Sequence, residues 1–342
     1  MSTRIINGDS LEILKSMADE SVNCVITSPP YYGLRDYGVD GQIGLEETPE
    51  EYINSLVAIF REVKRVLKKD GTLWLNIGDS YAGSGKGAWS NKQDQKEVYV
   101  PDADSPQAKM KKTFEGIKAK DLIGIPWMLA FALRADGWYL RQDIIWAKPN
   151  AMPESTRDRC TKSHEYIFLL SKSSKYYFDF ESIMEPRIGM NNDMPAGSKG
   201  AFGPCQSRYR ASGNKERKPR PTPLDHLCGS VPYVEGNPLK RKRDVWNIAT
   251  KPYKEAHFAT FPEALVEPCL LAGCPDGGTA LDPFAGAGTV GVVCKKQGKN
   301  FIGIELNPEY ATLATKRIEN TEISTNKAPE NEQIPGQMEI SV

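Results

Sequence analysis

Short apolar runs alternate with amphipathic stretches in the first part of the chain. Residues 22–27 and 72–77 are apolar and rich in β-branched side chains, and residues 4–7 form a shorter run, so each predicts a strand. Apolar residues recur at helical spacing over 11–17 and over 48–67, which predicts two amphipathic helices. This succession of strand, helix and strand favours a parallel sheet of the α/β class.

The same patterns continue in the middle of the chain. They predict a helix over 122–136 and strands over 138–146 and 163–171. Residues 175–178 follow a short polar turn, and we expect them to pair with 163–171 as a hairpin. Antiparallel strands of this kind are typical of one edge of a mostly parallel sheet.

The last third of the chain repeats the alternation of strands and helices. Apolar runs predict ordered chain at 245–248 and strands at 279–281 and 299–305. Helical spacing predicts three further helices, which begin at Thr260 or Pro262, after Thr289 and at Asn307.

Three stretches lack this periodicity. Residues 81–120 predict a mobile insertion, and the polar residues 321–342 predict a disordered tail. Residues 181–245 are also irregular, and the net charge of residues 187–243 within them is +8. A solvated loop is one interpretation, but contacts with nucleic-acid phosphates explain the sign of the charge better. The candidate phosphate contacts are Arg208, Arg210, Arg217, Lys218, Arg220, Lys240, Arg241, Lys242 and Arg243.

Composition limits the protein classes that fit these elements. The chain has 342 residues, a net charge of zero, 39% hydrophobic and 26% charged residues, as expected for a soluble globular protein with a sizeable core. We expect no signal peptide and no membrane span, because no apolar run is long enough. Seven cysteines without a C-x-x-C pair favour reduced thiols and a cytoplasmic protein. The three histidines lie far apart in sequence, so we expect no metal site.

The stretch Ser28-Pro29-Pro30-Tyr31 follows the strand 22–27 directly. Proline cannot donate to a strand ladder, so the strand should end here in a rigid shelf at the sheet edge where ligands bind in open α/β folds. The Ser28 hydroxyl and the Pro29 carbonyl could accept hydrogen bonds from an exocyclic amine and free its lone pair from the ring. Tyr31 could stack on that ring. A proline-rich turn with a packed tyrosine is the alternative.

A glycine-rich turn near the C-terminus forms a second constellation. Residues 282–289 read Asp-Pro-Phe-Ala-Gly-Ala-Gly-Thr, and Glu305 ends the next strand. A strand, a glycine-rich turn, a helix and a strand that ends in an acid are typical of nucleotide binding, although the spacing differs from G-x-G-x-x-G. Gly286 and Gly288 would let the backbone approach a ligand, and Glu305 could accept hydrogen bonds from ribose hydroxyls. Asp9, after the first strand, could cap a helix or face the nucleotide.

Both motifs resemble those of the S-adenosylmethionine-dependent amino-methyltransferases of DNA. Their order, with the catalytic motif first and the cofactor loop last, resembles the permuted β group of that family. The resemblance implies a Rossmann-like α/β fold with an antiparallel edge and a basic target-recognition insertion. It implies S-adenosyl-L-methionine as cofactor and a catalytic role for Ser28, Pro29, Pro30 and Tyr31. The implied cofactor contacts are Asp9 at the adenine, His257, Phe258, Ala259 and Thr260 at the methionine end, and Asp282, Phe284, Gly286, Gly288, Thr289 and Glu305 at the middle.

The resemblance also implies a division of the chain. Residues 1–180 would form the catalytic part, 181–245 the target-recognition region and 246–320 the cofactor-binding part, followed by the tail 321–342.

We therefore expect a DNA methyltransferase that acts on double-stranded DNA by flipping a base. Ser28 stands where adenine enzymes commonly have Asp, which favours N4 of cytosine, with N6 of adenine as the alternative. More distant alternatives are an RNA or protein methyltransferase and a non-catalytic module that binds nucleic acid with S-adenosylmethionine. A cognate restriction endonuclease stays open as a partner, as does the choice between monomer and dimer.

Overall fold

The computed structural model describes residues 1–34, 38–82, 116–186, 239–250 and 261–323. It divides into two compact units. The larger unit joins Met1–Ser182 with Arg243–Val342, and the smaller unit is Ile183–Lys242.

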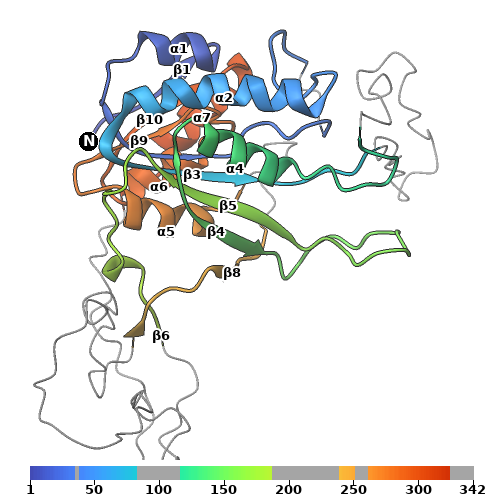
Figure 1. Ribbon diagram of the computed structural model, residues 1–342. Coiled ribbons are helices and arrows are strands. Elements are labelled where there is room, and N and C mark those ends of the chain that lie inside the picture. The colour runs from blue at the N-terminus through green and yellow to red at the C-terminus, as the bar shows by residue number, and fades with distance from the viewer. Residues whose placement is uncertain (35–37, 83–115, 187–238, 251–260, 324–342) are drawn as a thin grey trace, which may run out of the picture. The chain divides into compact units, whose positions relative to one another are not determined.

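An eight-stranded sheet forms the centre of the larger unit, in the order β1-β10-β9-β2-β3-β5-β4-β8 (Figure 1). Among these strands only β5 runs opposite to the others, because it pairs antiparallel with β3 on one side and with β4 on the other. The strands are β1 (Thr3–Asn7), β2 (Val22–Thr27), β3 (Leu67–Ile77), β4 (Tyr139–Ala147), β5 (His164–Ser171), β8 (Val245–Asn247), β9 (Thr279–Asp282) and β10 (Asn300–Glu305). The predicted α/β class with a mostly parallel sheet is confirmed.

Helices cover both faces of this sheet (Figure 1). On one face α1, α2 and α4 pack in a row, and on the other α5, α6 and α7 pack in succession. Their bounds are α1 (Ser10–Ser16), α2 (Pro49–Val66), α4 (Ile125–Ala135), α5 (Glu263–Gly273), α6 (Thr289–Lys296) and α7 (Pro308–Glu319).

The first and last parts of the chain build this sheet together. β1 pairs with β10 in parallel, and β2 pairs with β9 in parallel. Because parallel strands end at the same edge, the loops after β1, β2, β9 and β10 lie together at the carboxyl edge of the sheet. A permuted fold requires such a shared sheet, and the permutation itself stays an interpretation.

Local sequence signals account for the helix α2 and its packing. Thr48 and Glu51 form a reciprocal capping box, and Pro49 occupies the first helical position, where no N–H is needed. The buried stripe on this helix includes Tyr52, Leu56 and Phe60, all fully excluded from solvent. It packs in the main core with Leu73 and Leu75 of β3 and therefore holds the helix on the sheet.

The clearest differences from the predicted elements concern two strands. β3 begins at Leu67, five residues before the predicted start, because Val22 of β2 pairs with Leu67 before a register shift. The predicted hairpin strand at 175–178 is wrong. Both edges of β5 are already occupied by β3 and β4, so the segment crosses the end of the sheet, where the Tyr177 N–H donates to the Asp70 carbonyl (2.8 Å).

The described residues of the smaller unit form a short ladder. β6 (Glu185–Pro186) pairs antiparallel with β7 (Leu239–Lys240), and Lys240 forms an ion pair with Glu185 (3.4 Å). The predicted functional division of the chain at 181–245 stays a prediction. Most of the predicted insertion 81–120 and tail 321–342 lies outside the described residues.

Within the described ranges, none of the helices is long and apolar enough to cross a membrane.

Candidate active site

The predicted shelf, residues 28–31, lies at the carboxyl end of β2, and α2 contacts it through Tyr52. The Tyr52 hydroxyl of α2 donates to the Pro30 carbonyl (2.7 Å), and the Tyr52 ring packs against Tyr32 with centroids 5.4 Å apart. The Leu34 N–H donates to the Tyr31 carbonyl (3.3 Å). In contrast, the Pro29 carbonyl accepts no hydrogen bond from any described residue. The shelf therefore keeps one backbone acceptor for a ligand beside the Ser28 hydroxyl.

Tyr31 is partly buried, and its hydroxyl reaches three side chains. It donates towards Glu165 Oε2 (2.8 Å) and Asn76 Oδ1 (3.2 Å), while the Ser28 hydroxyl lies at the long distance of 3.5 Å. The ring lies against Gly78, where an added Cβ would approach Tyr31 Cε2 to 2.7 Å. Burial, together with the negative charge of Glu165, raises the pKa of the Tyr31 phenol well above its usual range, so it stays protonated and remains a donor.

Sequence reasoning missed Glu165, Asn76 and Lys148. Glu165 pairs with Lys148, and both side chains are largely buried, with 15% and 19% of their surfaces exposed. Lys148 Nζ also lies 4.2 Å from the centre of the Trp146 ring. Glu165 could have been noticed because it is the only acid in the apolar strand β5. Its partners could not, because they belong to three other segments.

The predicted cofactor loop joins β9 to α6. Asp282, at the end of β9, is buried and accepts hydrogen bonds from the Thr27 hydroxyl (2.6 Å) and the Phe284 N–H (3.0 Å). Burial raises the pKa of Asp282 to about 7, against the effect of these two donors. Thr27 is the last residue of β2 and directly precedes Ser28, so this hydrogen bond connects the shelf to the loop.

Glu305 lies next to this loop at the end of β10. Its Oε2 accepts from the Gly286 N–H (2.8 Å) and its Oε1 from the Asn307 N–H (2.9 Å). Burial raises the pKa of Glu305 above its usual value. Each oxygen keeps a further lone pair, so the carboxylate can still accept hydroxyl donors from a ligand.

The two predicted glycines of the loop differ in their surroundings. Both have positive φ, +51° at Gly286 and +74° at Gly288, which other residues rarely adopt. An added Cβ at Gly288 would approach Ala314 Cβ to 2.9 Å, so this glycine permits helix packing. An added Cβ at Gly286 would meet nothing within 4 Å of it. Gly286 therefore borders open space, as a ligand site requires.

The other predicted cofactor residues occupy different environments. Asp9 is exposed and caps α1 by accepting from the Glu12 N–H (3.0 Å), and the Ser10 hydroxyl donates to the Pro283 carbonyl (2.6 Å). The loop after β1 thus lies against the cofactor loop. Thr289 is buried, and its hydroxyl accepts from Arg317 (3.1 Å). This contact gives Thr289 a packing role in the larger unit.

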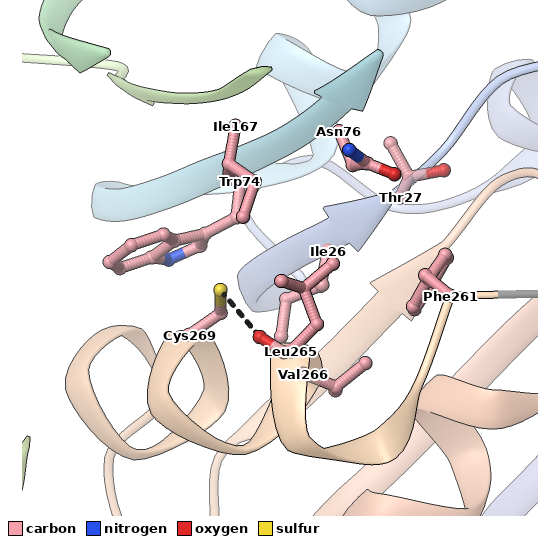
Figure 2. Close-up of a pocket in the computed structure, with 9 residues that line it drawn as sticks. All are labelled: Ile26, Thr27, Trp74, Asn76, Ile167, Phe261, Leu265, Val266 and Cys269. Carbon is pink, nitrogen blue, oxygen red and sulfur yellow. Dashed lines mark hydrogen bonds between the residues drawn. The ribbon is translucent and has the colours of Figure 1, made fainter. Parts of the chain in front are cut away.

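A small, mostly apolar pocket lies between the sheet and α5 (Figure 2). Thr27 and Asn76 line it from the ends of β2 and β3, and Phe261 lines it from the segment just before α5. His257, Phe258, Ala259 and Thr260, which immediately precede Phe261 in sequence, lie outside the described residues. The remaining lining residues are Ile26, Trp74, Ile167, Leu265, Val266 and Cys269.

Few of the predicted phosphate contacts can be located. Arg208, Arg210, Arg217, Lys218 and Arg220 lie outside the described residues. Lys240 pairs with Glu185, and Arg241 and Arg243 are exposed while Lys242 is partly exposed. In the part of the chain that the structure describes, no three His, Cys, Asp or Glu side chains gather to hold a metal ion.

Comparison with known proteins identifies the family. A family model described as DNA methylase, of the N6 and N4 type, matches residues 22–316. The chain belongs to this DNA methylase family. It is a Type II DNA methyltransferase of the N4 and N6 amino-methyltransferases, whose cofactor is S-adenosyl-L-methionine. It is 49% identical over 317 residues to the Type II methyltransferase M.SmaI of Serratia marcescens, covering 93% of this chain and 91% of that protein. It is 45% identical over 318 residues to M.Cfr9I of Citrobacter freundii, covering 92% and 87%.

Solved structures share the fold of this methyltransferase. The PvuII DNA methyltransferase, described as cytosine-N4-specific, matches 93% of this chain and 86% of its own with a TM-score of 0.58 and 18% identity. TTHA0409 of Thermus thermophilus, in complex with S-adenosyl-L-methionine, matches 94% and 96% with a TM-score of 0.51 and 21% identity.

Proposed function

We propose that this DNA methyltransferase transfers a methyl group to the exocyclic N4 of cytosine, in a base flipped out of double-stranded DNA. The observation that carries the proposal is the pair of acceptors at the end of β2. The Ser28 hydroxyl and the Pro29 carbonyl stand next to the anchored Tyr31, and no described residue donates to the Pro29 carbonyl. A rigid acceptor pair of this kind suits an NH₂ group on a flat ring.

The shelf residues would prepare the amine for transfer. Ser28 and Pro29 would accept hydrogen bonds from the two N–H groups of the amine. These bonds would pull the nitrogen towards tetrahedral geometry and localise its lone pair, while Tyr31 stacks on the base. The two prolines fix the backbone that carries these groups, so orientation would supply much of the rate. Pro30 has a supporting role, since its carbonyl is occupied by Tyr52.

The residues of the other loops fit the family's cofactor. Gly286 leaves open space beside the loop, and Glu305 keeps lone pairs for ribose hydroxyls. Asp9 and Phe284 lie on loops that meet at the same sheet edge and would contact the adenosine. His257, Phe258, Ala259 and Thr260 would contact the methionine end, as the resemblance to the family implies. When bound, the cofactor supplies an electrophilic methyl group on a positively charged sulfur.

The choice of cytosine rests on Ser28. A serine hydroxyl is a neutral acceptor, in contrast to the aspartate that is common in the adenine enzymes of this family. The PvuII enzyme, which shares the fold, is named as cytosine-N4-specific, but at 18% identity that likeness concerns the fold.

The sequence relatives suggest the biological partners. M.SmaI and M.Cfr9I are Type II methyltransferases, so we propose a cognate restriction endonuclease that cuts the same unmethylated site. Basic residues of 187–243 would contact DNA phosphates on either side of the target base.

Mass spectrometry of nucleosides tests this proposal. The protein is incubated with unmethylated DNA of high sequence complexity and with S-adenosylmethionine labelled in the methyl group. We expect labelled N4-methylcytosine. Labelled N6-methyladenine would contradict the assignment of the base, and label in RNA but not in DNA would contradict the assignment of the substrate.

A further inference from the structure

Four neighbouring strands each bring one polar side chain to the same edge of the sheet. In the order β2, β3, β5 and β4, the groups are Tyr31 after β2, Asn76 in β3, Glu165 in β5 and Lys148 after β4. The reversed direction of β5 matters here. It places the second residue of that strand, Glu165, at the edge where the parallel strands end.

The hydrogen-bond geometry identifies the main acceptor for Tyr31. The phenol has one proton, and Glu165 Oε2 lies closer (2.8 Å) than Asn76 Oδ1 (3.2 Å). The Asn76 amide donates to the same carboxylate oxygen (3.3 Å) and to the Tyr166 carbonyl (3.1 Å), which fixes the amide orientation. A charged acceptor also makes the stronger hydrogen bond. Glu165 is therefore the group that orients the hydroxyl.

The second carboxylate oxygen of Glu165 is held as well. Lys148 binds Oε1, and its ammonium lies over the Trp146 ring. Trp146 in turn donates from Nε1 to the Ile248 carbonyl (2.8 Å), which fixes the ring. Lys148 therefore offsets the desolvation of this largely buried carboxylate and holds its second oxygen in place.

We propose that Glu165, with Asn76 and Lys148, is a positioning residue that sets the plane of the Tyr31 ring for stacking on the target base. The backbone end of Tyr31 is fixed by Pro29 and Pro30, and one edge of its ring lies on Gly78. Without Glu165 the hydroxyl would keep only its longer contacts with Asn76 (3.2 Å) and Ser28 (3.5 Å). The ring could then turn out of the stacking plane, and misplacement by about 1 Å can reduce turnover about 100-fold.

This inference rests on base methylation as proposed above, and it holds for either cytosine or adenine. The first test does not depend on methylation at all. The protein is labelled with 3-fluorotyrosine, and the ¹⁹F signal that disappears in Tyr31→Phe is assigned to Tyr31. In Glu165→Ala we expect this signal to move towards that of solvent-exposed fluorotyrosine, while the other signals stay in place. An unchanged Tyr31 signal would overturn the proposal.

The second test is a double-mutant cycle on turnover of unmethylated DNA. Glu165→Ala should reduce kcat about tenfold in the presence of Tyr31 but less than about twofold in the Tyr31→Phe background, because the hydroxyl is then already absent. Glu165→Gln, which keeps an acceptor and the shape, should lose less than Glu165→Ala. An equal loss in both backgrounds would overturn the proposal.

A matched variant controls for the loss of a carboxylate. Glu20→Gln removes an ion pair with Lys172 (3.5 Å) that lies near the amino end of β2, away from the shelf. It should leave kcat and the ¹⁹F signal of Tyr31 unchanged. Failure of wild-type protein to methylate DNA would refute the proposed function, whereas the ¹⁹F result would still decide the role of Glu165.

Discussion

Two largely buried carboxylates at the same sheet edge are held in different ways. Glu305 accepts from the backbone N–H groups of Gly286 and Asn307, both within 19 residues of it. Glu165 is held by the side chains of Tyr31 and Lys148, and Tyr31 is 134 residues away in sequence. The first arrangement is local and depends on loop conformation. The second depends on the strand order of the sheet. We assign the Glu305 side to cofactor binding and the Glu165 side to the target base.

Substitution of Tyr31 should affect turnover most strongly and leave cofactor binding unchanged. Tyr31→Ala removes the stacking surface and should reduce kcat by about 100-fold or more, while the dissociation constant of S-adenosylmethionine changes less than about twofold. Steady-state kinetics and calorimetry measure the two quantities.

The control for this variant is Tyr176→Ala. Tyr176 accepts from Arg141 (3.2 Å) near the start of β4, at the opposite end of that strand from Lys148, so its loss should leave kcat unchanged. If Tyr31→Ala lost turnover and cofactor affinity to the same extent, Tyr31 would not belong to the target-base side alone.

The next prediction concerns Asp282, which links the two sides through Thr27. Its pKa in the folded state, about 7, lies above the ordinary value of 3.8, so the folded state binds the extra proton. Stability from this group is fully present below pH 3.8 and is lost as pH rises towards 7. Asp282→Asn keeps acceptors for Thr27 and Phe284 but does not titrate.

The free energy of unfolding measures this effect. Between pH 5 and pH 7.5 the wild-type protein should lose on the order of 2 kcal/mol of stability relative to Asp282→Asn. Urea denaturation at both pH values tests it. A constant difference between the two proteins would show that Asp282 is ionised throughout and that its burial costs little.

A pair of glycine variants tests whether Gly286 borders the cofactor site. Gly286 and Gly298 both have positive φ, and in both an added Cβ would meet nothing within 4 Å. Gly286→Ala and Gly298→Ala should therefore carry a similar backbone penalty of about 1–2 kcal/mol. Only Gly286→Ala should weaken cofactor binding, by about tenfold, because only Gly286 borders the proposed site. Equal cofactor affinities in the two variants would contradict that position.

The smallest expected effect concerns DNA phosphates. Neutral substitutions of Lys240, Arg241, Lys242 and Arg243 should reduce the slope of log affinity against log salt by about 0.9 for each residue that contacts a phosphate. Fluorescence anisotropy with duplex DNA over a range of salt measures it. An unchanged slope would show that these four residues do not contact phosphates.

The comparison of the two sides also explains which parts of the site the sequence could predict. The loop 282–289 and Glu305 belong to one stretch of strand, turn, helix and strand. In the structure Glu305 accepts from Gly286, and Ser10, next to Asp9, donates to Pro283. Their role in cofactor binding stays a prediction. Glu165 and Asn76 lie inside apolar strands, where a polar residue gives no sign of its partner. Their role depends on the order β2-β3-β5-β4 and on the reversal of β5.

The fold was predictable to a similar degree and for similar reasons. The capping box at Thr48 and the apolar runs of β2 and β9 located elements, because these signals are local. The error at 175–178 arose because pairing is not local. A polar turn followed by aromatic residues is typical of a hairpin, but β5 already has partners on both sides. Roles assigned to His257–Thr260 and to Arg208–Arg220 stay predictions.

Cofactor affinity decides whether the two carboxylates serve different ligands. Isothermal titration calorimetry of S-adenosylmethionine would compare Glu305→Ala and Glu165→Ala with the wild-type protein. We predict that Glu305→Ala weakens binding by about tenfold or more, while Glu165→Ala changes it by less than about twofold. Weaker binding in Glu165→Ala, or unchanged binding in Glu305→Ala, would contradict the division of the site.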